Sequence, residues 1–418
     1  MYIFAVVKFN NNEMSDLALD QKLKEIITSI TLYANDRMKT QDAYEDFGLF
    51  NGHWGMLLFE AYYLHYNDKC DFQRFFDEHL DFCLTSLSDG YQVYSYSNGL
   101  CGMLLALEHL QKKEFIEIDI SEAIDVYDNL FKQILEQELQ NPNYDFLHGI
   151  IGLGFYFLHR NNVLSISCIE NIIKHLWSDA IINGEQYAWK TILNLSGIKA
   201  FNICLSHGMS SIAVFLARVY EKSILKDQTF RLLQGCIRFI LAQEIDYKKY
   251  GSYFPSITIE YEQPDILKSR MGWCYGDLGV ALSLWQCGKI LHDDCLKMKS
   301  LEILRFSTRR KLLEENSVFD ACLCHGTSGI AQIFLRMYYE TGITSFLESN
   351  KFWVSETLKM AQCTNNVAGF RTLEVKQSKL NYFDNYSFLE GISGIGLSLM
   401  ASNLDIHFSD WDAFLLMK

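Results

Sequence analysis

The hydrophobic positions of this 418-residue chain follow two patterns that alternate along the sequence. In the first pattern, apolar residues recur at steps of three and four, as on one face of a helix. The stretch SEAIDVYDNLFKQILEQEL is an example, with Ser121 as a favourable N-cap and apolar positions at Ile124, Tyr127, Phe131 and Ile134. In the second pattern, ten or more residues are apolar nearly throughout, which predicts helices that are buried on all sides.

Each of the long apolar runs begins at a G-x-x-G pattern, and this pattern occurs seven times. The steps between successive first glycines are 47, 50, 59, 68, 50 and 65 residues, and these glycines are Gly52, Gly99, Gly149, Gly208, Gly276, Gly326 and Gly391. In the fourth copy Ser211 replaces the second glycine. Glycine lets the start of a helix and the turn before it approach a neighbour closely. Each unit therefore reads as an outer amphipathic helix, a turn and an inner buried helix.

Seven such helical hairpins could form an open solenoid or close into a ring. A solenoid would have more uniform repeats and polar capping units at its ends, whereas the last copy here is as rich in glycine as the middle ones. We therefore predict an all-α fold, an α/α toroid, in which residues 1–418 form one domain. The longer steps predict surface insertions near 160–205, 215–270 and 335–385. Only YKKYGSYFPSITIEYEQP shows an alternation typical of strands.

Composition narrows the class of protein. Three prolines in the whole chain suit a mostly helical fold, and a net charge of −14 argues against binding to nucleic acid. The apolar start MYIFAVV lacks a basic stretch and a cleavage site, and no run reaches the 18 apolar residues that a transmembrane segment needs. We expect a cytoplasmic protein whose 12 cysteines are mainly reduced, most of them as small buried apolar residues.

The residues just before the seven glycines would meet on one rim of the predicted ring. Two cysteines and a histidine stand there, Cys274 before Gly276 and Cys324-His325 before Gly326. Two thiolates and one imidazole with a fourth position left open are the ligands of a catalytic zinc site. A Cys-His neighbour is weak evidence alone, and the sequence lacks the C-x-x-C spacing of a zinc knuckle. Metal binding is favoured because the two cysteines occupy equivalent positions in two repeats.

The chain resembles the lanthionine synthetase C family of zinc-dependent lantibiotic cyclases, whose fold is a double ring of seven outer and seven inner helices. The resemblance runs through the seven glycine repeats and through two motifs, W-C-Y-G at Trp273–Gly276 and C-H-G at Cys324–Gly326. His207-Gly208 in the fourth repeat also matches the family, as do Asp145, four residues before Gly149, and Arg270, four before Cys274. Ser211 departs from the pattern, and so does His148, where a carboxylate is often found.

This resemblance implies the reaction of a peptide cysteine with a dehydroalanine or dehydrobutyrine in a dehydrated precursor peptide. Zinc, one per chain, would be held by Cys274, Cys324 and His325. The thiolate would add to the β-carbon to form a (methyl)lanthionine thioether, and His207 would act as acid or base near neutral pH. Asp145 would orient His207 or relay its proton.

More than one role is open for the remaining candidate residues on the rim. Arg270 would stabilise the enolate or hold the rim together by an ion pair. Tyr275 would donate a hydrogen bond there or serve only in packing. A structural role is favoured for His148, Glu390 and His53. Cys322 is expected to point away from the metal into the core.

Two other functions stay open at this stage. A thiol-adding enzyme that acts on glutathione or modified proteins would keep the ring and the zinc but use a different electrophile. A helical-repeat binding scaffold would hold no metal and would catalyse no reaction. Neighbouring genes for a dehydratase and a small peptide rich in Cys, Ser and Thr would favour the cyclase, whose partners could include that dehydratase and an ABC exporter at the membrane.

Overall fold

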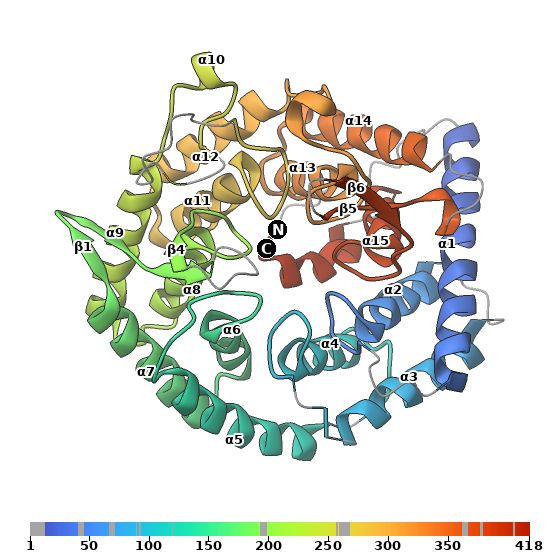
Figure 1. The fold of residues 1–418 in the computed structure, drawn as a ribbon, viewed down its shortest axis with the longest axis horizontal. Helices are drawn as coiled ribbons and strands as arrows, with labels where there is room; N and C mark the ends of the chain where they lie inside the picture. The colour runs from blue at the N-terminus through green and yellow to red at the C-terminus, as the bar shows by residue number, and fades with distance from the viewer. Residues whose placement is uncertain are drawn as a thin grey trace, which may run out of the picture.

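The seven apolar runs form the inner ring of the computed structural model (Figure 1). Each run becomes a helix that starts within one or two residues of its first glycine, because the turn before it ends there. The inner helices are α2 (His53–Tyr66), α4 (Leu100–Lys112), α6 (Ile150–Arg160), α8 (Met209–Glu221), α11 (Asp277–Leu291), α13 (Thr327–Thr341) and α15 (Ile392–Asn403). Most of their residues are buried, as the continuous hydrophobicity predicted.

The amphipathic stretches form an outer ring around the inner one (Figure 1). These helices are α1 (Glu13–Thr40), α3 (Gln73–Ser88), α5 (Ser121–Glu138), α7 (Val163–Asp179), α9 (Lys226–Ala242), α12 (Asp294–Ser307) and α14 (Thr344–Met360). Helix α15 packs against both α1 and α2, so the last unit contacts the first and the ring closes. The predicted α/α toroid is confirmed.

The helix predicted around residue 121 illustrates how an outer helix forms. It begins at Ser121 itself, with Ile120 in the N-cap position, so the predicted start is wrong by one residue. Ile124 and Phe131 are buried, and Tyr127 and Ile134 pack against the core beside them. The apolar face of α5 therefore points inward, as its spacing predicted.

The structure describes residues 13–40, 46–66, 72–88, 90–91, 93–118, 120–192, 199–255, 258, 268–361, 367–376, 379–403 and 406–418. The apolar start MYIFAVV lies outside these residues. None of the helices within them is long and apolar enough to cross a membrane. Ten cysteines fall in the described part of the chain; all are free thiols, and every one except Cys295 is buried, as expected.

Backbone hydrogen bonds join the turns before the inner helices around one end of the ring. The Phe50 N–H donates to the Ser97 carbonyl at 2.8 Å, and the Ser97 N–H donates to Leu147 at 3.0 Å. In the same way, the Cys274 N–H donates to the Cys324 carbonyl and the Cys324 N–H donates to the Leu389 carbonyl, each at 3.1 Å. The Leu389 N–H donates to the Phe50 carbonyl at 2.9 Å, which joins the last turn to the first. Because these turns are hydrogen-bonded to one another, side chains from distant repeats are held in a fixed relation.

Glycine is required in these turns for two reasons. Gly276 has a φ of +104°, a conformation that other residues rarely adopt. A Cβ at Gly329 would overlap the carbonyl oxygen of Leu323 in its own turn, so the helix start could not fold back so closely. Ser211 occupies the corresponding position in the fourth unit, where its hydroxyl donates to the Gly208 carbonyl at 2.8 Å and α8 still starts at Met209.

Within the described residues, three antiparallel hairpins interrupt the helices, and none of them includes the stretch whose alternation suggested a strand. They are β1 (Ile181–Asn183) with β2 (Gln186–Ala188), β3 (Lys190–Ile192) with β4 (Lys199–Phe201), and β5 (Thr372–Lys376) with β6 (Lys379–Phe383). The stretch expected to resemble a strand contains a short helix, α10 (Tyr247–Tyr250), and an isolated bridge between Pro255 and Lys268. Residues 256–257 and 259–267 lie outside the described residues.

The C-terminal segment η4 (Ile406–Leu415) lies at the centre of the ring (Figure 1). Arg336 of α13 forms a buried ion pair with Asp412 at 2.7 Å. The Trp273 indole donates to the Leu415 carbonyl at 2.6 Å, and the Tyr96 hydroxyl donates to Phe414 at 3.3 Å. The segment therefore supports the inside of the ring directly beneath the turn that carries Cys274.

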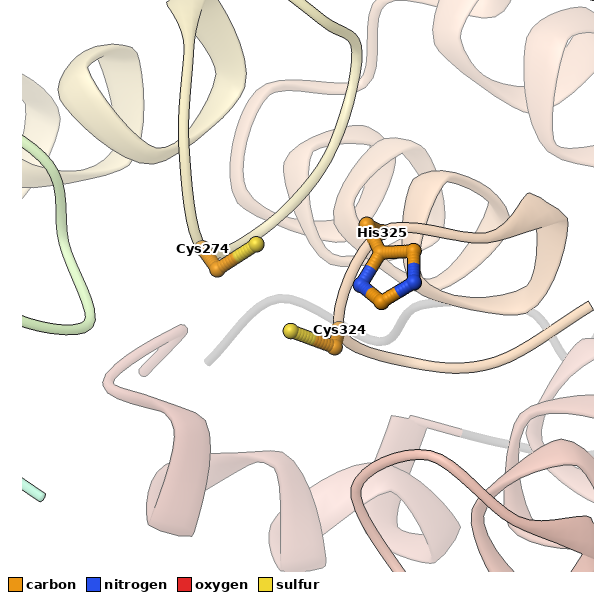
Figure 2. A group of neighbouring side chains, drawn as sticks. All are labelled: Cys274, Cys324 and His325. Atoms are coloured by element: carbon orange, nitrogen blue, oxygen red, sulfur yellow. The ribbon is translucent and has the colours of Figure 1, made fainter. Parts of the chain in front are cut away.

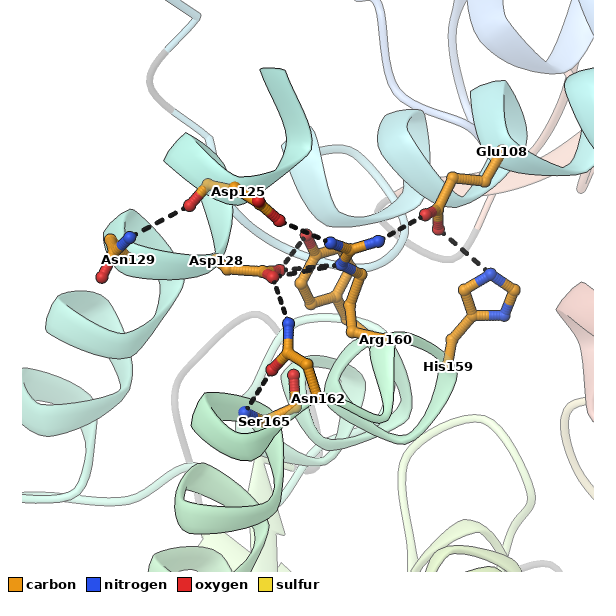
Figure 3. A network of polar contacts seen from close by, with 9 residues as sticks. Glu108, Asp125, Asp128, Asn129, His159, Arg160, Asn162 and Ser165 are labelled. Atoms are coloured by element: carbon orange, nitrogen blue, oxygen red, sulfur yellow. Dashed lines mark hydrogen bonds and ion pairs between the residues drawn. The ribbon is translucent and has the colours of Figure 1, made fainter. Parts of the chain in front are cut away.

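One ion-pair network holds the second and third units together (Figure 3). Arg160, at the end of α6, contacts Glu108 of α4 at 2.9 Å and both Asp125 and Asp128 of α5 at 3.0 Å. Asp128 is buried, and it also accepts hydrogen bonds from Tyr156 at 2.7 Å and Asn162 at 2.7 Å. Removal of Arg160 would leave the Asp128 charge without its guanidinium partner inside the protein.

We expect Arg160→Ala to lower the free energy of unfolding by about 3 kcal/mol, because it breaks a largely buried ion pair from one side. Arg74→Ala serves as the control, since Arg74 pairs with Glu78 on the exposed surface of α3 and should contribute less than about 1 kcal/mol. Urea unfolding of both variants measures the difference. Equal effects would mean that the network adds nothing beyond an exposed pair.

Candidate functional site

Cys274, Cys324 and His325 come together at the rim (Figure 2). Cys274 lies in the turn before α11, and Cys324 and His325 lie in the turn before α13. One ligand atom from each of the three residues lies within 4.8 Å of the others. The Cys274 N–H donates to the Cys324 carbonyl at 3.1 Å, so the backbone linkage of the ring sets their approach. Both cysteines are buried and the His325 side chain is 17% exposed, which leaves the cluster open to solvent at the histidine.

The chemistry of this group fits a metal ion. The pKa of the Cys274 thiol lies well below its usual value, because Cys324 donates a hydrogen bond to it and His325 and Arg270 lie nearby; together these outweigh burial. The pKa of Cys324 is raised well above its usual value by the same hydrogen bond and by burial. The two sulfurs are therefore hydrogen-bonded to each other, in a place where a cation could bind both. Two sulfurs and one nitrogen are suitable ligands for zinc with one position open.

A second group of possible ligands shares His325. Asp320, Cys322 and His325 also have ligand atoms within 4.8 Å of one another. The Asp320 Oδ2 lies 3.5 Å from His325 Nε2, and the Cys322 sulfur accepts the His325 N–H at 3.4 Å. Cys322 is buried, as expected, and it is not grouped with Cys274 and Cys324.

His207 and Asp145 form a pair between the fourth and third units. The Nδ1 of His207 lies 2.7 Å from Asp145 Oδ2, and Asp145 Oδ1 accepts the His148 N–H at 2.8 Å. Burial alone would lower the pKa of His207, but the Asp145 carboxylate outweighs it and raises that pKa above its usual value. Since Asp145 is buried and the His207 side chain is 26% exposed, the free Nε2 is the nitrogen available to a ligand.

Tyr275 and Arg270 lie beside these groups. The Tyr275 ring lies 6.3 Å from that of His207, and its hydroxyl accepts a hydrogen bond from Asn202 at 3.3 Å. Burial raises the pKa of Tyr275, so the phenol stays protonated. Arg270 is half-buried and lowers the pKa of Cys274 through its charge. Its guanidinium forms no ion pair with the part of the chain that the structure describes, so the rim ion pair considered for it is not found there.

The other rim candidates lie in different environments. His148 is exposed, stacks on His207 with ring centres 5.9 Å apart, and approaches the Ser97 hydroxyl at 3.2 Å. Burial raises the pKa of Glu390, and the nearby His325 partly offsets this. His53 is fully buried and meets His79 of α3 at 2.8 Å, away from the metal ligands. The structural role favoured for His53 agrees with this position.

A repeated pattern that was not predicted from the sequence lies upstream of the glycines. Asparagine or aspartate stands six residues before the first glycine in five of the seven units, at Asp46, Asn143, Asn202, Asp320 and Asn385. The carbonyl of each accepts the N–H of the residue that follows the first glycine. Four of the side chains also accept the N–H two residues on, as in Asx turns. A search for polar residues at fixed distances from the glycines would have found Asp320.

The profile of the lanthionine synthetase C-like proteins matches residues 56–416. The chain belongs to this family. Nisin biosynthesis protein NisC of Lactococcus lactis subsp. lactis is 24% identical over 425 residues, which span 95% of this chain and 96% of NisC. A solved structure of nisin cyclase superposes with a TM-score of 0.76 at 20% identity and covers 95% of this chain and 97% of its own. The comparison with nisin cyclase supports the same toroidal fold.

Proposed function

We propose that this protein is a zinc-dependent lanthipeptide cyclase. It would add cysteine thiols of a dehydrated precursor peptide to dehydroalanine or dehydrobutyrine, forming lanthionine or methyllanthionine rings. The observation that carries the proposal is the grouping of Cys274, Cys324 and His325 on the same rim as the His207–Asp145 pair. Membership in the lanthionine synthetase C-like family and the similarity to NisC along nearly the whole chain point the same way.

Cys274, Cys324 and His325 would hold the zinc ion. When bound, zinc supplies an open position for a peptide thiol and lowers the pKa of that thiol. The buried cysteines keep their sulfurs fixed, because the backbone of one turn is hydrogen-bonded to the next. The peptide can approach from the side on which His325 is exposed.

The chain's own residues would manage the charge and the proton of the addition. The peptide thiol gives up its proton to solvent, and a carbon–sulfur bond forms at the β-carbon. The alkene electrons move toward the carbonyl as an enolate, and the α-carbon then takes up a proton. His207 would deliver this proton from Nε2, since Asp145 holds Nδ1 and favours the protonated ring. Arg270 would stabilise the negative charge of the enolate, and Tyr275 would donate a hydrogen bond.

The substrate would then be a peptide in which Ser and Thr have already been dehydrated. A dehydratase must act first, and an ABC exporter would remove the product, so these are the expected partners. Such a complex would work in the cytoplasm, at the membrane surface.

Incubation with a dehydrated peptide that contains one cysteine and one dehydroalanine tests this function. A cyclase removes the free thiol without changing the peptide mass, so the product resists alkylation. A parallel reaction contains glutathione and a peptide that has a dehydroalanine but no cysteine. A mass gain of one glutathione, together with no ring formation in the first peptide, would favour the thiol-adding alternative and contradict the cyclase.

A further inference from the structure

The imidazole of His325 contacts different groups on its two sides. One ring nitrogen faces the sulfurs of Cys274 and Cys324 (Figure 2). The other, Nε2, lies 3.5 Å from Asp320 Oδ2. Asp320 is only 2% exposed, so its carboxylate acts on the ring with little screening by water.

Backbone groups fix the position of Asp320 independently of His325. Its Oδ1 accepts the Cys322 N–H at 3.2 Å, and its Oδ2 accepts the Leu373 N–H of strand β5 at 3.2 Å. Its carbonyl accepts the Thr327 N–H at the start of α13, also at 3.2 Å. The carboxylate is therefore held between the turn of the sixth unit and the β5–β6 hairpin.

A second metal site at Asp320, Cys322 and His325 is the competing explanation for this geometry. However, both Asp320 oxygens already accept backbone N–H groups, and the Cys322 sulfur accepts the His325 N–H. The corresponding side chains of four other units accept an N–H in the same way, among them Cys204 from His207 at 3.2 Å and Ser387 from Glu390 at 3.4 Å. Cys322 thus has the turn-capping role of its equivalents.

We propose that Asp320 is a positioning residue that orients the His325 ring and selects the tautomer with hydrogen on Nε2, leaving the other nitrogen to bind the metal. This inference rests on the metal site proposed above. A carboxylate behind a ligating histidine fixes the ring and makes it a better ligand, and its loss costs about 10–100-fold in metal affinity. The same carboxylate ties the ligand to hairpin β5–β6.

The experiment compares Asp320→Asn with Asp46→Asn. Asp46 holds the same place in the first turn and accepts the Gly48 N–H at 2.8 Å, but the rim residue of that turn is Asn51, not a metal ligand. Zinc affinity is measured by competition with a chelator, and the absorption spectrum of the Co²⁺-loaded protein reports the ligand geometry. We expect Asp320→Asn to bind zinc 10–100-fold more weakly and to shift the Co²⁺ bands, whereas Asp46→Asn keeps both near wild type.

Cys322→Ser and Asp320→Ser complete the set. Cys322→Ser should keep one zinc per chain at wild-type affinity; two zinc ions in the wild type and one in this variant would overturn the proposal in favour of a second site. If Asp320→Asn unfolds at a lower temperature than the wild type, Asp320→Ser is measured in its place. Wild-type affinity in the Asp320 variants, or equal losses in Asp46→Asn, would also overturn it. A wild-type protein that binds no zinc would instead contradict the proposed metal site itself.

Discussion

Replacing Cys274 with alanine is expected to remove most of the zinc and to reduce cyclisation to background, while the helical circular dichroism stays near wild type. Two ligands, Cys324 and His325, would remain, and they come from a single turn. The toroid is held by the buried faces of fourteen helices and by the backbone links between turns, so the core does not depend on the ion. Zinc content per chain and single-turnover loss of peptide thiol measure the two effects.

Cys287→Ala is the matched control for this variant. Cys287 is a fully buried free thiol in α11, the helix that follows Cys274, and it belongs to neither group of possible ligands. It should keep about one zinc per chain and wild-type cyclisation. Stoichiometric zinc in Cys274→Ala would contradict the ligand assignment, and global unfolding on chelation would indicate a structural metal site instead.

Replacing His207 with alanine is expected to separate proton transfer from metal binding. The variant should keep its zinc and bind the dehydrated peptide, but ring formation should fall by about 10²–10⁴-fold, the usual contribution of a positioned acid or base. His148→Ala is the control, because His148 stacks on His207 but is exposed. Wild-type rates in His207→Ala would make the histidine structural, and zinc loss would place it among the ligands.

The same assignment predicts the pH dependence of cyclisation. A histidine that donates a proton is active in its charged form, so the rate should be constant below its pKa and fall as pH rises through it. Asp145 raises the pKa of His207, and Asp145→Asn should therefore move this fall to lower pH. Cyclisation rates between pH 5.5 and 9 measure the shift. An unchanged profile in Asp145→Asn would mean that the carboxylate does not act through His207.

The ring could be predicted from the sequence because its determinants are local and repeated. The glycines at 52, 99, 149, 208, 276, 326 and 391 mark every inner helix, and the three- and four-residue spacing marks outer helices such as α5. The hairpins and η4 had no comparable signal. Segment η4 is placed by long-range contacts such as Arg336 with Asp412, which leave no periodic pattern in the chain.

The site was predicted only in part, for a related reason. Cys274, Cys324 and His325 stand one or two residues before glycines, so the repeat predicted that they share a rim. Asp320 stands six residues before its glycine, as four other Asn and Asp residues do in their units. This shared position indicates a role in the turn and does not indicate the contact with His325. The buried pairing of His53 with His79 also depends on how α2 packs on α3, which the repeat does not specify.

Zinc add-back to the chelated protein tests whether the bound metal is needed for ring formation, because metal occupancy and ring formation are measured on the same sample. The protein is stripped of metal, zinc is returned in steps, and the loss of free thiol from a dehydrated peptide is followed at each step. A zinc-dependent cyclase should show a cyclisation rate that rises in proportion to occupancy and levels off at about one zinc per chain. Full cyclisation without zinc, or full occupancy without cyclisation, would mean that the bound metal does not drive the reaction.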